Sequence, residues 1–313
     1  MSKPLISIIS PVFNEQENLV LVCQGILKAA DSLKDHYEAE IIFVNDGSTD
    51  QSAEVLERLA DSDSRVKYVE FSRNFGKEIA LSCGINFARG QAVIILDADL
   101  EHPPFLIPDF VRKWEQGAEV VIGIRKKRGK ESLAKKLGSI CFYKIMGLIG
   151  ETKILSGETD FRLIDIKVAN EFKRFTERGR LARGLIDWLG FKRDYLYFVP
   201  SQRMGSRPRY SFWKLVHLAV TSFVSHSLFP LKLAGYLGVF ITLFAGPFGV
   251  FMFINRYFFH WLIFSGPAML AVFNLFLIGI VLICLGLMAL YIANIHLEVS
   301  NRPLYVVRKK KNF

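Results

Sequence analysis

Short apolar runs alternate with segments of helical periodicity through the first 125 residues. Runs rich in β-branched residues predict buried strands at 5–10, 40–45, 66–71, 92–97 and 119–124. Between them, apolar residues recur at helical spacing near 15–34, 51–61, 76–89 and 104–116. This alternation is typical of an α/β fold in which helices cover both faces of a mostly parallel sheet.

The pattern changes after residue 125. Apolar positions with lysines beside them predict membrane-surface helices at about 131–150 and, after a second basic and aromatic stretch, at about 210–228. For the first of these, an ordinary amphipathic helix packed on the sheet is the alternative. Between them we expect a loop leading into a short strand at 156–165, a helix near 181–189 and a strand near 192–199.

Two long stretches near the C-terminus, 233–255 and 257–297, contain no Asp, Glu, Lys or Arg. Each exceeds the roughly 20 residues that cross a bilayer. We therefore predict a transmembrane hairpin over 229–298, with spans at about 231–254 and 267–293. Because basic residues favour the cytoplasmic side of membrane segments, we expect the basic tail 299–313 and the large domain 1–228 in the cytoplasm.

Composition and charge narrow the classes of protein. The chain is 51% hydrophobic and 22% charged. Together with the two uncharged stretches, this composition excludes a purely soluble enzyme, a disordered chain and a many-span transporter. Residues 1–110 contain 9 basic and 18 acidic residues, although the net charge of the whole chain is +10. The positive charge thus lies in the half that holds the uncharged stretches, so we expect an anionic membrane or a phosphate-bearing lipid as partner, and no nucleic acid.

Polar clusters follow four consecutive predicted strands. In chain order they are PVFNE, NDGSTD, SRNFGKE and DADLEHPP. Since ligands collect at the carboxyl ends of parallel strands, the clusters predict a ligand site at one edge of the sheet. In NDGSTD, the residues Ser48, Thr49 and Asp50 are also candidates to cap the following helix.

The acidic cluster of Asp97, Asp99 and Glu101 is the strongest chemical signal. Asp97 and Asp99 are two positions apart at the end of a strand, so their side chains leave on the same side. Carboxylates this close repel one another unless a cation lies among them, and hard oxygen ligands favour Mg²⁺ or Mn²⁺ shared with substrate phosphates. The cluster predicts a metal that holds a nucleotide diphosphate; a solvated acidic turn that caps the next helix is the alternative.

Five motifs in this order, PVFNE, NDGSTD, SRNFGKE, DADLEHPP and SGETDFRLID, resemble family 2 glycosyltransferases of the GT-A (Rossmann-like) fold. The hairpin and ALYIANIHLEVSNRPLYVV narrow the resemblance to the polyprenyl-phosphate glycosyltransferases, the dolichyl-phosphate-mannose-synthase-like group with two C-terminal spans. The resemblance implies an inverting transfer from a nucleotide-sugar donor, UDP-glucose or a related UDP-sugar, to a polyprenyl phosphate. It also implies undecaprenyl phosphate as acceptor, a bacterial inner membrane and a homo-oligomer, with a tetramer as the expected state.

The resemblance further implies roles for individual residues. Those that would bind the nucleotide sugar are Pro11, Phe13, Glu15, Asp46 and Asp97, with turn and cap duty as the alternative for the first four. Those that would hold the metal are Asp99 and Glu101. Those that would grip the lipid phosphate are Arg125, Lys135, Ser139, Arg203 and Arg209. The catalytic residue that faces the acceptor would be Asp160.

The chemistry of the acceptor limits the role of Asp160. A phosphate monoester has a second pKa near 6, so it is mostly dianionic at neutral pH and needs little proton removal. We therefore expect Asp160 to orient the nucleophile and sugar, or to balance nearby arginines, rather than to act mainly as a base. A structural salt bridge with Arg162 is the alternative.

The chain departs from the family pattern at two places, and two other functions stay open. Glu101 stands where the family commonly has Gln, and RMGSRPRY has Ser206 and Pro208 in place of a usual glycine and serine. A membrane polysaccharide glycosyltransferase would usually have more spans and a QxxRW-type motif, which the sequence lacks. A non-catalytic nucleotide-sugar-binding membrane module is disfavoured because the acidic residues are retained.

Overall fold

The computed structural model describes residues 3–125, 157–199, 254, 258 and 266–313. The chain divides into two compact units, one formed by Met1–Arg209 with Arg302–Phe313 and the other by Tyr210–Asn301. The predicted surface helices at about 131–150 and 210–228 lie outside the described residues. So do four of the residues predicted to bind the lipid phosphate, Lys135, Ser139, Arg203 and Arg209.

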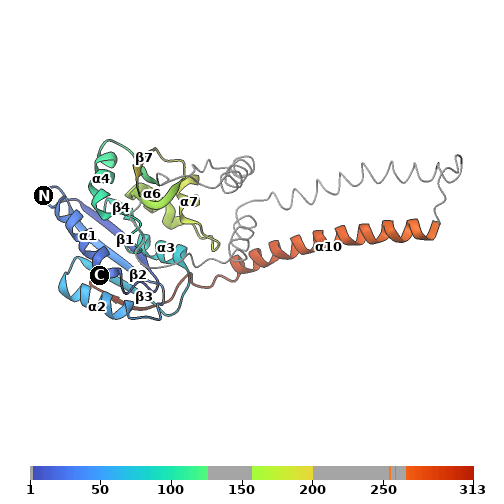
Figure 1. Cartoon of the computed structure of the whole chain (residues 1–313), viewed down its shortest axis with the longest axis horizontal. Helices are drawn as coiled ribbons and strands as arrows, with labels where there is room; N and C mark the ends of the chain where they lie inside the picture. Colours follow the sequence, from blue (N-terminus) through green and yellow to red (C-terminus); the bar gives the residue numbers. More distant parts are fainter. Residues whose placement is uncertain (1–2, 126–156, 200–253, 255–257, 259–265) are drawn as a thin grey trace. The chain divides into compact units, whose positions relative to one another are not determined.

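One eight-stranded sheet forms the centre of the first unit, in the order β7-β5-β6-β4-β1-β2-β3-β8 (Figure 1). Four neighbouring strands run parallel: β1 (Leu5–Val12), β2 (Glu38–Asn45), β3 (Val66–Phe71) and β4 (Ala92–Ile95). Strand β6 (Glu158–Asp165) lies antiparallel between β4 and β5 (Val120–Arg125), and β7 (Arg193–Phe198) pairs in parallel with β5. The mostly parallel α/β sheet that the sequence predicts is confirmed.

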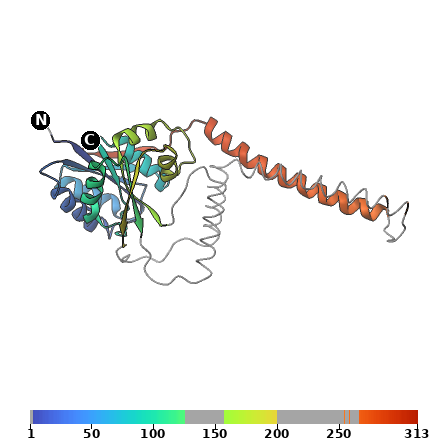
Figure 2. The same cartoon turned by 90° about the horizontal axis from the view of Figure 1, so that it is seen from above.

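Helices cover both faces of this sheet (Figure 2). One face carries α1 (Leu19–Asp31), α2 (Ser52–Ser62) and α4 (Ile107–Glu115), which follows the short 3-10 helix η1 (Pro104–Leu106). The other carries α3 (Lys77–Phe87), α6 (Ile166–Arg174) and α7 (Ala182–Trp188).

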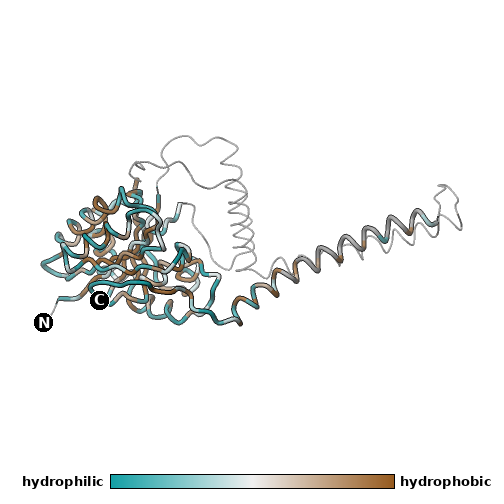
Figure 3. Tube along the Cα trace, turned by 90° about the horizontal axis from the view of Figure 1, so that it is seen from below, coloured by the Kyte–Doolittle hydropathy of each residue, from teal (hydrophilic) through white to brown (hydrophobic). Residues whose placement is uncertain are grey.

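The two faces are built by period-two alternation along the strands. In β2, Ile41 and Phe43 pack in the first core, whereas Ile42 and Val44 pack in the second, and all four are 0% exposed. Figure 3 shows the resulting concentration of hydrophobic positions along the strands between the helices. Full burial of such a side chain contributes roughly 1.5–3 kcal/mol, so the two cores fix the sheet rigidly beneath its carboxyl edge.

Two details differ from the sequence prediction. The N-cap position of α2 is Gln51, but the predicted cap Asp50 does accept a hydrogen bond from the first amide of the helix, Ser52 N, at 3.0 Å. The other two predicted caps hold the PVFNE loop: Ser48 Oγ accepts from Asn14 N at 3.0 Å, and Thr49 N donates to Asn14 Oδ1 at 2.8 Å. Helix α6 was not predicted. Its N-cap Asp165 accepts a hydrogen bond from Lys167 N, which is an ordinary cap whose signal lies inside the motif SGETDFRLID.

Part of the predicted basic tail 299–313 pairs with the sheet. Val307–Lys311 forms strand β8, antiparallel to β3, and its cations pair with acidic residues of the acidic N-terminal region: Lys309 Nζ lies 2.6 Å from Glu57 Oε1. An edge strand whose central residues are exposed is hard to recognise in a run of basic residues, because a run of like charges usually indicates a solvated segment.

The second unit contains the long helix α10 (Gly266–Val299). Within the ranges that the structure describes, no helix is both long and apolar enough to cross a membrane. The second predicted span, about 267–293, falls inside α10, and residues 231–253 of the first predicted span lie outside the described residues.

Candidate active site

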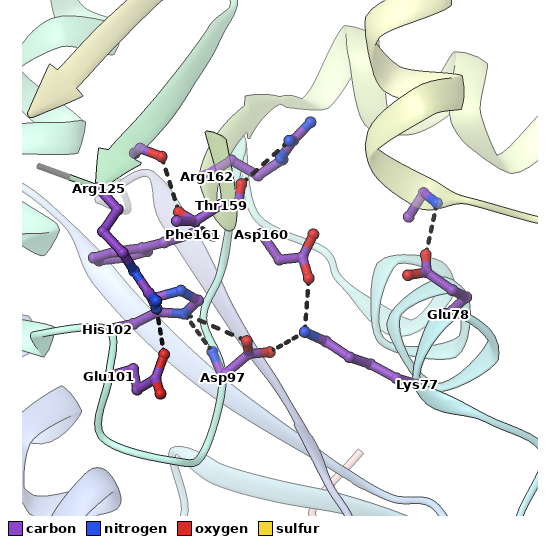
Figure 4. A network of polar contacts seen from close by, with 12 residues as sticks. Lys77, Glu78, Asp97, Glu101, His102, Arg125, Thr159, Asp160, Phe161 and Arg162 are labelled. Atoms are coloured by element: carbon purple, nitrogen blue, oxygen red, sulfur yellow. Dashed lines mark hydrogen bonds and ion pairs between the residues drawn. The ribbon is translucent and has the colours of Figure 1, made fainter. Parts of the chain in front are cut away.

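One lysine joins the two acidic strand ends that the sequence assigns to donor and acceptor. Lys77, the first residue of α3, places Nζ 2.6 Å from Asp97 Oδ1 and 2.7 Å from Asp160 Oδ2 (Figure 4). Asp97 follows β4, and Asp160 lies on the neighbouring strand β6. The sequence analysis singled out the motif SRNFGKE but assigned no role to its lysine. The signal available was that the only Lys or Arg residues in the four polar strand-end clusters, Arg73 and Lys77, lie in this motif.

The lysine controls the charge of Asp160. Burial alone would raise the pKa of this carboxyl, but Lys77, and after it Arg162 and Arg183, outweigh that effect and lower the pKa to about 2. In return, the two carboxylates raise the pKa of Lys77 above its ordinary value, although burial opposes them. Asp160 is therefore a fixed anion at neutral pH, which is far from the pKa that suits a general base.

The predicted metal ligands lie in a tight turn beside this bridge. Leu100, between them, has a φ of +64°, a left-handed conformation that is uncommon for residues other than glycine and that concentrates at functional sites. Asp99 Oδ1 accepts a hydrogen bond from Glu101 N at 3.0 Å, and the Glu101 carboxylate forms an ion pair with Arg125 Nη2. The structure thus brings together a predicted metal ligand and a residue predicted to bind the lipid phosphate.

A buried histidine supports the turn from behind. Asp97 N donates to His102 Nδ1 at 3.0 Å, and the imidazole stacks on Phe161 with 5.2 Å between ring centroids. Burial lowers the pKa of His102, so the ring is neutral at neutral pH, and its Nδ1 is an acceptor. His102 therefore fixes the backbone at the end of β4 and supplies no charge to the site.

The donor set at the turn fits a divalent cation that is shared with a phosphate ligand. Among the described residues, no group of three or more His, Cys, Asp or Glu side chains could hold a metal alone. Burial, and then the charges of Asp97 and Glu101, raise the pKa of Asp99. A cation bound beside this carboxylate would stabilise its ionised form. Mg²⁺ commonly takes only one or two protein carboxylates and completes its shell with substrate phosphates and water.

The residues predicted to bind the nucleotide fall into two groups. Phe13 is 41% exposed beside the end of β1, where Pro11 also lies, and Glu15 Oε2 accepts from Asn18 Nδ2 at 2.7 Å. Asp46 is only 3% exposed, and its carboxylate accepts hydrogen bonds from Phe75 N at 2.7 Å and Gly76 N at 2.9 Å. Asp46 thus holds the backbone before Lys77, a contact that could not be predicted because the two segments are 29 or more residues apart.

The α/β fold and the acidic carboxyl edge around Lys77 fit a nucleotide-sugar glycosyltransferase of the GT-A type. The sequence profile of Glycosyl transferase family 2 matches residues 7–172, and the chain belongs to this family. It is 39% identical to the uncharacterized glycosyltransferase YkcC of Bacillus subtilis (strain 168), over 97% of this chain and 93% of that protein.

Two further relatives carry more specific names. The chain is 36% identical to the SfII prophage-derived bactoprenol glucosyl transferase of Shigella flexneri, over 97% of each protein. It is 35% identical to the prophage bactoprenol glucosyl transferase homolog of Escherichia coli (strain K12), over 98% of this chain and 99% of that protein. The predicted resemblance to family 2 enzymes that act on polyprenyl phosphates is confirmed.

Among solved structures, a mannosyltransferase from Pyrobaculum calidifontis in complex with GDP-Man and Mn²⁺ is similar to the chain. The match covers 97% of this chain and 89% of that one, with 16% identity and a TM-score of 0.48. This likeness is too weak to assign ligands to the present chain.

Proposed function

We propose that the protein transfers glucose from UDP-glucose to undecaprenyl phosphate with inversion at the anomeric carbon. The single observation that carries the proposal is the Lys77 bridge, which puts the carboxylates of Asp97 and Asp160 within reach of one ammonium group. Relatives that match over nearly their whole length and are named bactoprenol glucosyl transferases support the sugar and the acceptor.

The donor would lie over the turn at the end of β4. In this proposal Asp97 would meet the ribose and diphosphate, the exposed ring of Phe13 would meet the base, and Asp99 with Glu101 would hold Mg²⁺ or Mn²⁺. When bound, the cation neutralises negative charge that develops on the departing diphosphate. Arg125, which pairs with Glu101, is a second positive group at this edge.

The acceptor would approach from the side of Asp160. Its phosphate arrives mostly as a dianion, and Asp160, ionised because its pKa is about 2, does not need to remove a proton. Two anions that approach each other need a positive group between them, and Lys77 Nζ is 2.7 Å from Asp160 Oδ2. We assign to Asp160 the orientation of Lys77 and of the nucleophile, and to Lys77 the attraction of the phosphate groups.

The lipid acceptor also requires the site to work at a membrane. The uncharged stretches 233–255 and 257–297 and the basic character of the sequence after residue 110 support membrane association. The two-span hairpin, the cytoplasmic orientation, the inner-membrane location and the homotetramer stay predictions from the sequence.

Transfer assays with the purified full-length chain test this function. UDP-glucose, other UDP-sugars and GDP-mannose would be offered with undecaprenyl phosphate and Mn²⁺, and the lipid product would be analysed by mass spectrometry. We expect the mass of one added hexose with UDP-glucose, inverted anomeric configuration, and loss of product with EDTA. As a matched control, D109N removes an aspartate on α4, outside the acidic turn, and should leave product formation unchanged.

Other outcomes would contradict the proposal in separate ways. Addition of several sugars to one acceptor would indicate a polysaccharide glycosyltransferase. Nucleotide binding without turnover of any donor would indicate a non-catalytic module. Equal transfer in EDTA would contradict the assignment of a metal to Asp99 and Glu101 while leaving the acceptor assignment intact.

A further inference from the structure

The segment that follows α10 contacts the loop 72–76, which joins β3 to Lys77 at the start of α3, although more than 220 residues separate the two segments in the sequence. Residues 302–313 belong to the same compact unit as the catalytic sheet. Ser72 N, at the start of the loop, donates to Val306 O at 2.9 Å, and Arg308 Nη2 donates to Ser72 O at 2.9 Å. Both backbone groups of Ser72 are therefore bound by this C-terminal segment.

An aromatic cluster extends the contact along the loop. The ring of Tyr305 stacks on Phe71 with 5.1 Å between centroids, and Phe71 meets Phe75 edge-to-face at 5.6 Å. Phe71 is 0% exposed, and Tyr305 is among the side chains packed on its core. Tyr305 thus contacts the residue before the loop directly and is linked through Phe71 to Phe75, two residues before Lys77.

The rest of the loop has little freedom to adjust. Gly47 has a φ of +64°, and a Cβ added there would lie 2.3 Å from the carbonyl carbon of Arg73, so the loop packs directly on the backbone of Gly47. Asp46 holds the amides of Phe75 and Gly76 at 2.7 and 2.9 Å. A displacement at Ser72 is therefore transmitted to the first residue of α3, which is Lys77.

We propose that Tyr305 is a positioning residue that holds Lys77 between Asp97 and Asp160. The inference rests on the proposed function for its effect on turnover, but the positioning itself is a property of the fold. A displacement of about 1 Å in a charged group at a reaction centre can lower a rate on the order of 100-fold. A small movement of Lys77 after the loss of the Tyr305 ring is therefore enough to change kcat.

Hydrogen exchange tests the positioning without any assay of activity. In the full-length chain, Y305A should increase exchange of the amides of Phe75 and Gly76 at least tenfold, whereas Y305F, which keeps the ring, should not. K311A is the matched control, because Lys311 pairs with Asp61 at the far end of β8. Unchanged exchange in Y305A, or an equal increase in K311A, would overturn the inference.

A double-mutant cycle tests the effect on turnover. Y305A should lower kcat about tenfold in the wild-type background and less than twofold in a K77M background, because its effect acts through Lys77. Y305F should restore kcat, and UDP-glucose KM should change less than kcat. Equal losses in both backgrounds would overturn the inference. If wild-type protein transfers no sugar, the proposed function fails, and the exchange experiment decides the positioning on its own.

Discussion

Carboxylates are buried at both edges of the sheet, but their hydrogen-bond donors and the direction of their pKa shifts differ. At the amino edge, Glu40 is 2% exposed and receives hydrogen bonds from Ser7 Oγ, from Arg89 N at 2.8 Å and from Lys67 Nζ at 2.7 Å. Burial raises its pKa, but these donors outweigh burial, so the pKa of Glu40 is lowered. At the carboxyl edge, two carboxylates, of Asp97 and Asp160, share the ammonium of one lysine, and burial with neighbouring anions raises the pKa of Asp99.

The difference separates a structural carboxylate from a functional one. Glu40 has donors of its own chain on both oxygens, so it needs nothing from outside and can stabilise the fold. At the carboxyl edge, the two carboxylates of Asp97 and Asp160 carry more negative charge than the one ammonium of Lys77 can balance. This edge is therefore suited to an added cation, and to anionic ligands that replace one of these carboxylates as the partner of Lys77. Electrostatic imbalance of this kind is typical of active sites.

Removal of the shared cation is the largest expected change. K77M should lower kcat by roughly 10³-fold, since a single preorganised donor at a site of developing charge contributes on the order of 10²–10³. Burial would then raise the pKa of Asp160 without this ammonium to oppose it, so the acid limb of kcat against pH should move to higher pH. Steady-state transfer rates from pH 5 to 9 measure both effects.

The chain supplies a matched control for this variant. Lys113 and Asp194 form a similar pair at 2.7 Å between α4 and β7, away from the acidic turn. K113M should change kcat less than twofold and leave the pH profile in place, and K77R should recover part of the lost rate. If K77M were as active as K113M, the carboxyl edge would be no more functional than the amino edge, and the comparison would fail.

Disruption of the amino edge should affect stability and leave the chemistry unchanged. E40Q leaves the Lys67 ammonium, whose side chain is 14% exposed, without its charged partner, and should lower the free energy of unfolding by about 3 kcal/mol. E38Q, at the exposed start of the same strand, should lower it by less than about 0.5 kcal/mol. Urea denaturation measures both, and kcat of the folded enzyme should be unchanged.

The pH dependence of this loss has a definite sign. Because the folded-state pKa of Glu40 lies below its ordinary value of 4.5, its stabilisation is fully present above that pH and is lost as the pH falls through the folded value. The difference in unfolding free energy between wild type and E40Q should therefore shrink below pH 4.5. A constant difference would show that Glu40 acts through packing rather than through its charge.

These two edges were not equally predictable from the sequence. The strands, five helical segments and the acidic turn follow from local periodicity and from the rule that parallel strands present their carboxyl ends together. The contact of Lys77 with Asp97 and Asp160 could not be predicted from local periodicity. It depends on the pairing of β4 with β6, two strands that are far apart in the sequence. Strand β8 was missed for the same reason, since its charges are balanced by Glu57, Asp61 and Glu70 from remote segments.

Two roles for Asp160 can be distinguished, an anion that orients Lys77 and the nucleophile or a general base. D160N keeps the shape of the side chain but removes its charge, and we expect kcat to fall about 100-fold, uniformly from pH 5 to 9. The uniform loss is expected because a carboxyl with a pKa of about 2 does not titrate in that range and so cannot serve as a titrating base. The matched control D194N removes the partner of Lys113 and should change kcat less than twofold. A loss confined to pH below about 6, where the acceptor phosphate retains its second proton, would instead make Asp160 the base, and the lysine bridge would then serve only to keep that base ionised.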